Sequence, residues 1–143
     1  MVSAHYQEQV FPPETNPLKE HTVTGMKNDF WDHIKRLLRD SRLIIDRPKG
    51  SRHPHYPDAI YPLDYGYLEG TISSDNSGIV VWVGSQSSRR LTGIACTYDT
   101  LKKDAEIKLL AGCSEEDIKK ILDFYALRMK TIIIPEPLQG AEE

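Results

Sequence analysis

The 143-residue sequence lacks the features that mark several large classes of protein. It has only two cysteines, Cys96 and Cys113, and their spacing does not match a metal site, so we expect reduced thiols in a cytoplasmic protein. No apolar run approaches the roughly 20 residues that a membrane-spanning helix needs, and we therefore expect no membrane partner. The first residues lack the basic and apolar segments of a signal peptide.

A strong charge of either sign is also absent. Lysine and arginine number 18, aspartate and glutamate 21, and the formal net charge is −3. Nonspecific nucleic-acid binding depends on a basic surface, so this balance argues against a nucleic-acid partner. We find no internal repeat. The length and composition predict one globular domain at residues 26–137, preceded by an extended arm at 1–25 and followed by a tail at 138–143.

The hydrophobic pattern predicts two helices and several short strands. One helix begins after the candidate cap Asn28, and a second follows Ser114, whose next three residues are acidic. Strands are expected at residues 43–45, 71–74, 79–83, 91–97, 106–110 and 132–134, joined by loops rather than by crossover helices. These elements predict an α+β fold, a small antiparallel OB-like β-barrel with flanking helices.

Residues 61–83, YPLDYGYLEGTISSDNSGIVVWV, combine tyrosines, a turn and an apolar strand in one short segment. The hydroxyls of Tyr61, Tyr65 and Tyr67 are able to donate hydrogen bonds to an anion. Residues 75–78 have turn chemistry, so the segment predicts a β-hairpin that presents polar groups at its tip. An ordinary tyrosine-rich hairpin without a binding role is the alternative interpretation.

A loop rich in proline and glycine is expected at residues 47–62. It carries a cluster of basic side chains, namely Arg47, Lys49, Arg52, His53 and His55. In a protein that is acidic overall, such a cluster is suited to a phosphate-like anion. A solvated loop is the alternative interpretation, and two histidines alone do not define a metal site.

Three segments together resemble the core of the family I soluble inorganic pyrophosphatases. YPLDYG with Asp75 downstream resembles the family's tyrosine motif and the start of its central acidic motif, D-G-D-P-x-D-V. DRPKGSR, from Asp46, resembles the E-I-P-K-G-S-R opening of the family. Asp99 and the following DAEIKLLAG resemble its second acidic motif. The resemblance covers residues 43–125.

The resemblance implies Mg²⁺-dependent hydrolysis of pyrophosphate to two phosphates, with Mn²⁺ as a possible substitute. It assigns the metal ions to Asp75, Asp99 and Glu106, with Asp104 as a further candidate ligand, and catalysis to Asp75, Tyr65 and Lys108. Substrate binding is assigned to Lys49, Arg52, Tyr61, Tyr65 and Tyr125. Asp46 matches a glutamate near the outer metals. Bacterial members form hexamers, so a homo-oligomer is a further expectation.

Two substitutions depart from the family motif. Ser77 replaces the aspartate that acts as a base toward the attacking water, and Val80 replaces an aspartate that bridges two metals. Valine is unable to bind Mg²⁺. Asp64 and Asp104 are candidates for a relocated carboxylate. The family's hairpin before the tyrosine motif, with its phosphate-binding arginine, is missing, and Arg47, Lys49 and Arg52 are candidates to replace that arginine.

Three hypotheses remain open from the sequence. The first is a divergent pyrophosphate hydrolase that keeps the remaining acidic residues. The second is a non-catalytic relative that binds a phosphate-containing ligand or a protein partner on the same surface. The third, hydrolysis of another phosphate ester, is not separated from the first by the sequence.

Overall fold

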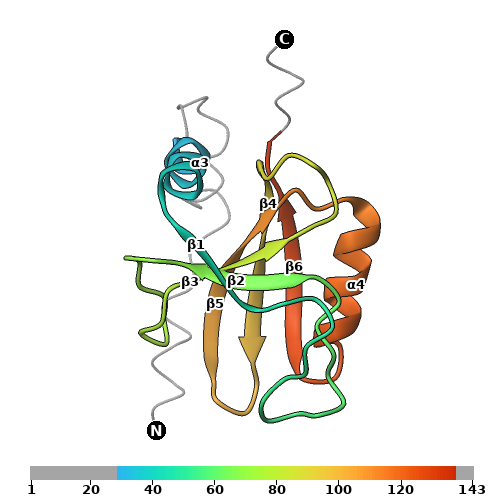
Figure 1. The fold of residues 1–143 in the computed structure, drawn as a ribbon. Helices are drawn as coiled ribbons and strands as arrows, with labels where there is room; N and C mark the ends of the chain where they lie inside the picture. Colours follow the sequence, from blue (N-terminus) through green and yellow to red (C-terminus); the bar gives the residue numbers. More distant parts are fainter. Residues whose placement is uncertain (1–28, 138–143) are drawn as a thin grey trace, which may run out of the picture.

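The computed structural model describes residues 29–137, which form a mixed α+β domain with one six-stranded sheet and two helices (Figure 1). In chain order the elements are α3 Phe30–Asp40, β1 Leu43–Arg47, β2 Asp64–Leu68, β3 Ile79–Val83, β4 Leu91–Asp99, β5 Asp104–Ala111, α4 Glu115–Tyr125 and β6 Met129–Pro135. The predicted arm, the predicted tail and the cap residue Asn28 lie outside the described residues.

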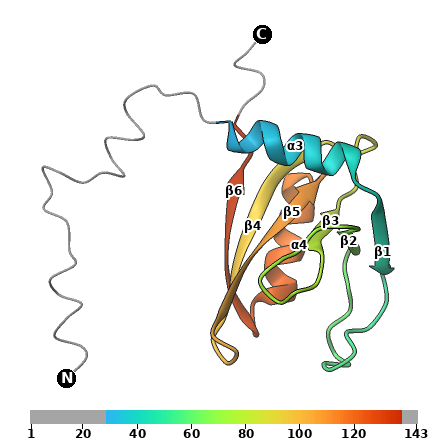
Figure 2. The same cartoon turned by 90° about the vertical axis from the view of Figure 1, so that its left-hand side faces the viewer.

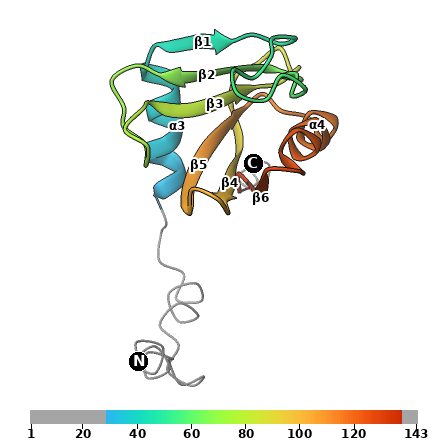
Figure 3. The ribbon, with the colours of Figure 1, turned by 90° about the horizontal axis from the view of Figure 1, so that it is seen from below.

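The strands lie in the order β1-β2-β3-β5-β4-β6. All neighbouring strands are antiparallel except β3 and β5, which run parallel, so the prediction of a purely antiparallel sheet was wrong at this pair. The reason is that β4 and β5 pair as a tight hairpin, and β5 rather than β4 takes the place beside β3. β1 and β6 form the two edges of an open, curved sheet (Figure 3), so a closed barrel is not confirmed.

The predicted strand at residues 71–74 was also wrong. These residues belong to the loop between β2 and β3, and the strand of the tyrosine motif is β2 itself. The Thr71 hydroxyl donates to the carbonyl oxygen of Leu68 at 2.7 Å and accepts from the backbone N–H of Ile79 at 2.8 Å. Thr71 therefore holds the two strand ends together by its side chain, and the polar–apolar alternation that follows it is not part of a strand.

The two helices cover opposite faces of the sheet (Figures 2 and 3). Alternation along β3 sends Val81 and Val83 toward α3, whereas Trp82 packs in the core on the α4 side. The α4 side is aromatic, since Tyr61 and Tyr125 pack around Trp82. On the α4 side of the sheet, polar residues lie next to the aromatic core.

Helix α4 confirms the predicted start at Ser114. The Ser114 hydroxyl accepts from the backbone N–H of Asp117 at 3.1 Å, and the Asp117 carboxylate accepts from the backbone N–H of Ser114 at 2.8 Å. This reciprocal capping box satisfies two donors that the first helical turn leaves open. None of the helices between residues 29 and 137 has the length and apolar character needed to cross a bilayer.

Candidate functional site

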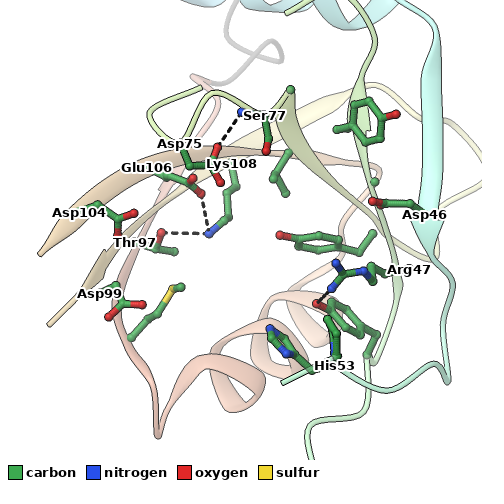
Figure 4. A pocket seen from close by; sticks show the side chains of 18 of the residues that line it. Asp46, Arg47, His53, Asp75, Ser77, Thr97, Asp99, Asp104, Glu106 and Lys108 are labelled. Carbon is green, nitrogen blue, oxygen red and sulfur yellow. Dashed lines mark hydrogen bonds and ion pairs between the residues drawn. The ribbon is translucent and has the colours of Figure 1, made fainter. Parts of the chain in front are cut away.

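A cavity of about 540 Å³ lies on the α4 face of the sheet, beyond the aromatic core (Figure 4). One side of it, here called the acidic side, carries four carboxylates, from Asp75, Asp99, Asp104 and Glu106. The opposite side, here called the basic side, carries Arg47 and His53 and also the carboxylate of Asp46. On this side His55 lies beside His53, Tyr61 bonds to Arg47, and Tyr65 packs against Tyr61. The pocket brings together segments that are far apart in the sequence, from Asp46 in β1 to Met129 at the start of β6.

The acidic side follows from strand geometry. Asp104, Glu106 and Lys108 occupy alternate positions of β5, so all three face the pocket, which confirms the prediction that Glu106 and Lys108 share a face. Asp99 of β4 lies directly opposite Asp104 in the antiparallel register. Like charges in this position repel each other, so a bound cation here would relieve an unfavourable interaction.

Lys108 is the central charged group of the pocket floor. Its side chain is 3% exposed and its ammonium lies 3.1 Å from Oε1 of Glu106, whose side chain is 13% exposed. The same ammonium donates to Oγ1 of Thr97 at 3.1 Å and lies 5.1 Å from the ring centroid of Tyr125. An ammonium held this way is paired and rigid. Thr97 was not predicted, and only its strand position on the same face as Asp99 marks it in the sequence.

Asp75 is oriented by its own loop. Its Oδ1 accepts from the Ser73 hydroxyl at 2.7 Å and from the backbone N–H of Ser77 at 3.0 Å. The hydrogen bond from Ser73 is the main reason that the pKa of Asp75 is lowered, against the opposing effect of burial. Asp75 is therefore ionised at neutral pH.

Asp99 caps the turn between β4 and β5. Its Oδ1 accepts from the backbone N–H groups of Leu101 at 2.9 Å and Lys102 at 3.0 Å. The bond from the Lys102 backbone contributes most to lowering the pKa of Asp99. This carboxylate thus has a structural role as a turn cap, and it also lines the pocket.

The basic side depends on a β-bulge at Asp46. The register between β1 and β2 steps from Ile45 opposite Gly66 to Arg47 opposite Tyr65, which leaves Asp46 unpaired. A bulge changes the direction of the residues that follow it. Arg47 thereby reaches the pocket, where its guanidinium donates to the hydroxyl oxygen of Tyr61 at 3.0 Å.

The two tyrosines of the pocket are kept protonated. Burial raises the pKa of Tyr61, although Arg47 opposes the effect, and burial raises the pKa of Tyr65 further. Because the Tyr61 oxygen accepts from Arg47, its own O–H remains able to donate to a ligand. Both residues are therefore hydrogen-bond donors at neutral pH.

Other predicted site residues lie elsewhere. Lys49 and Arg52 do not line the pocket, and the Arg52 guanidinium instead donates to the carbonyl oxygen of Pro57 at 3.0 Å. Asp64, a candidate for a relocated carboxylate, accepts the backbone N–H of Lys49 at 2.8 Å and is also outside the pocket, whereas Asp104 is inside it. Of the basic loop, the structure brings Arg47, His53 and His55 to the pocket.

Tyr125 is part of the aromatic core rather than of the pocket surface. It is 5% exposed, and its hydroxyl oxygen accepts from the indole N–H of Trp82 at 3.2 Å. Burial is the main cause of the raised pKa of its phenol. Tyr125 contacts the pocket only through its ring, which lies under the ammonium of Lys108.

Ser77 and Val80 both line the pocket, so the two departures from the family motif fall in the site itself. Val80 lies on β3 opposite Tyr67 of β2, and its side chain adds an apolar surface between the acidic and basic sides. Ser77 follows Asp75 in the loop that orients it.

The donor set fits a magnesium ion shared with a ligand better than a cage made by the protein alone. Within residues 29–137 no three histidine, cysteine or acidic side chains come together closely enough to hold a metal. Mg²⁺ is nevertheless commonly bound by one or two carboxylates together with substrate oxygens. Asp75 and Glu106 suit that arrangement, because their carboxyl groups lie close enough to interact with each other, and the hydrogen bonds of Asp75 to its own loop use Oδ1.

Comparison with known proteins does not assign the chain to a family. A scan against protein-family models finds no match, and a search of curated proteins finds none.

Proposed function

We propose that the protein is a pyrophosphatase-like hydrolase, which cleaves pyrophosphate to two phosphates with the help of Mg²⁺ or Mn²⁺. One observation carries the proposal: in a single pocket, four carboxylates lie opposite the guanidinium of Arg47 and the imidazole of His53, with Asp46 as the one carboxylate on that side. A second imidazole and two protonated tyrosines adjoin Arg47 and His53. Carboxylates suit a hard divalent cation, and the opposite groups suit phosphate oxygens.

The charge of the pocket explains why a metal would be needed. Five carboxylates line it, those of the acidic side and Asp46, against three permanent cations, Arg47, Lys102 and Lys108. Five negative and three positive charges leave a formal charge of −2 with neutral histidines. Such a pocket repels free pyrophosphate and accepts it when divalent cations accompany it.

The residues then have distinct roles. Asp75 and Glu106 would bind the cation, and Lys108 holds the Glu106 carboxylate in a fixed position. Tyr61, Tyr65 and Arg47 would donate to the phosphate oxygens. Bound Mg²⁺ supplies charge neutralisation and activation of water. Water adds to one phosphorus, the bond from that phosphorus to the bridging oxygen breaks, and the second phosphate leaves with that oxygen and a proton.

The proposal has two further parts, which concern the fold and the cellular location. We propose that the open sheet corresponds to an OB-like barrel in which β1 and β6 do not pair with each other. A cytoplasmic location is supported by the thiols of Cys96 and Cys113, which are both free. Burial raises the pKa of Cys113 to about 12, so this thiol is unreactive at neutral pH.

A second candidate function is binding without hydrolysis. It is favoured by Val80 and Ser77, which line the pocket where the family motif has acidic residues. In this case the protein would bind the same anion together with Mg²⁺, but it would not activate water efficiently.

Phosphate release from pyrophosphate in the presence of Mg²⁺ tests the proposal. We expect activity in the wild-type chain and a loss of at least tenfold in Asp75→Asn, because removing the charge weakens cation binding. Asp123→Asn, an exposed carboxylate on α4, is the matched control and is expected to be active. Activity only in Val80→Asp would support binding without hydrolysis. No release and no Mg²⁺-dependent stabilisation of either chain would refute both functions.

A further inference from the structure

The loop between β1 and β2 contains a histidine that the proposed mechanism does not use. His53 lines the pocket on its basic side, across from Asp99 (Figure 4). Its ring is partly buried and stacks parallel to the ring of Tyr61, with centroids 6.1 Å apart and an interplanar angle of 4°.

The loop holds this ring in a defined place. The backbone N–H of His53 donates to the carbonyl oxygen of Ala59 at 2.9 Å, and Arg52 forms an isolated β-bridge with Ile60. Tyr56 packs on the imidazole at 4.9 Å between centroids, and the guanidinium of Arg128 lies 4.7 Å from the Tyr56 ring centroid. The ring is thus in contact with both Tyr56 and Tyr61.

The hydrogen bonds of the loop also fix the tautomer of His53. Its Nδ1 accepts the backbone N–H of His55 at 3.0 Å, so Nδ1 carries no proton. The proton of the neutral ring is therefore on Nε2, which leaves this N–H as the polar group that the ring presents to a ligand.

The surroundings of His53 are positively charged. Burial is the main cause of its lowered pKa, and Arg47, His55, Arg128 and Lys102 lower it further by repulsion. Without a ligand the imidazole is neutral at pH 7. These groups come from β1, the loop itself, the β4–β5 turn and the segment after α4, and the phenols of Tyr56 and Tyr61 complete its surroundings.

From these contacts we infer that His53 is a phosphate-binding residue, whose Nε2–H donates to a terminal phosphate oxygen of the ligand on the basic side. A partly desolvated donor surrounded by cations is suited to an anion and disfavours a metal ion there. The inference rests on the proposed function, because it concerns the phosphate group of the same ligand that lies on the basic side of the pocket.

Two amide substitutions separate the two ring nitrogens. Asparagine places an acceptor near Nδ1 and lacks a donor at Nε2, whereas glutamine places an NH₂ donor near Nε2 and lacks the Nδ1 acceptor. His53→Asn therefore keeps the hydrogen bond within the loop and loses the ligand donor. His53→Gln keeps the ligand donor and loses the bond to His55.

Calorimetric titration of the full chain with methylenediphosphonate and Mg²⁺ tests the inference, because the P–C–P bridge of this probe is not hydrolysed. We expect roughly tenfold weaker binding in His53→Asn and a smaller loss in His53→Gln. Binding to His53→Asn that equals wild type would overturn the inference. Equal losses in both variants would also overturn it, because they would assign His53 to the support of the loop.

Proton NMR of the imidazole rings gives a second readout. A bound anion favours the imidazolium, so we expect the pKa of His53 to rise when the probe binds. The ring signals of the exposed His33 on α3 are expected not to respond to the probe. No change at His53 on binding would contradict the inference.

Different results would refute the proposed hydrolysis and the proposed role of His53. Mg²⁺-dependent hydrolysis together with unaltered probe binding by His53→Asn would refute the role of His53 and leave the proposed function intact. A His53 that responds to the probe in a chain without hydrolysis would refute the enzyme and leave the binding residue intact. Absence of probe binding by the wild-type chain would refute the role of His53.

Discussion

The ammonium nitrogen of Lys108 lies 3.1 Å from Oε1 of Glu106, and both side chains are largely buried. Removing one partner of a buried pair leaves a charge without compensation, which typically costs about 3 kcal/mol or more. We therefore expect Lys108→Met to lower the free energy of unfolding by about this amount, measured by urea denaturation. Glu106→Gln is expected to be destabilising too.

The double variant Lys108→Met/Glu106→Gln is the control for this pair. It removes both charges, and we expect it to be more stable than the sum of the two single losses predicts, because neither charge is then left unpaired. Strict additivity of the two single effects would show that the pair is not coupled.

Tyr125 gives a direct test of one sequence-based assignment. The resemblance placed it at the substrate, whereas the structure places its hydroxyl against the indole N–H of Trp82, at 3.2 Å in the core. We expect Tyr125→Phe to cost about 1 kcal/mol of stability, because the buried indole N–H loses its acceptor. Binding of Mg²⁺-methylenediphosphonate is expected to be unchanged. Weaker binding at unchanged stability would restore the original assignment, and Tyr61→Phe is the matched variant inside the pocket.

Part of the acidic side was predictable because it depends on a local rule. Alternation along a strand places Glu106 and Lys108 on one face whatever the partner strands are. Asp104 was expected in the connection before the strand, whereas β5 begins at this residue. Likewise, a serine followed by acidic residues starts a helix through hydrogen bonds within four residues, and Ser114 confirms this. Local spacing was sufficient for these features.

The basic side was predictable only as a cluster. Whether Arg47 reaches the pocket depends on the bulge at Asp46, and a bulge is a property of the pairing between β1 and β2. The same limitation explains the parallel pair of β3 and β5, since a hairpin between β4 and β5 does not reveal which of the two strands lies beside β3. The strand order and the position of Arg47 therefore depend on long-range strand pairing, which local sequence patterns do not reveal.

Gly66 lies where that pairing is tightest, opposite the residue before the bulge. A Cβ atom added there would lie 2.0 Å from the carbonyl oxygen of Ile44, which belongs to the backbone of the adjacent strand. We expect Gly66→Ala to destabilise the protein by about 3 kcal/mol and to disturb the pocket, because β1 has to shift. Thermal unfolding and probe binding measure the two effects.

Gly50→Ala is the matched control for this substitution. Gly50 has a φ of +91° and no atom within 4 Å of the added Cβ, so only backbone strain of about 1 kcal/mol is expected. A similar loss in both variants would show that the close approach of β1 to Gly66 contributes little.

The stability of the α4 start is expected to depend on pH through Asp117. Its Oδ2 accepts from the backbone N–H of Ser85, the Ser85 hydroxyl and the backbone N–H of Ser114, at 2.8, 2.9 and 2.8 Å. Burial opposes ionisation, but these hydrogen bonds outweigh it and lower the pKa of Asp117. Folding therefore favours the ionised carboxylate.

A lowered pKa in the folded state means that the stabilisation is complete above the unfolded value of about 3.9 and is lost as the pH falls through the folded value. We expect Asp117→Asn to cost about 2 kcal/mol at pH 7, since hydrogen bonds to a charged acceptor are replaced by weaker ones, and to cost less at pH 3. Urea unfolding of both chains at the two pH values measures the difference. Asp75 and Asp99 also have lowered pKa values, but they are present in both chains, so their contribution cancels in the comparison. A cost for Asp117→Asn that does not change between pH 7 and pH 3 would show that the shape of the side chain, rather than its charge, holds the helix start against the Ser85 loop.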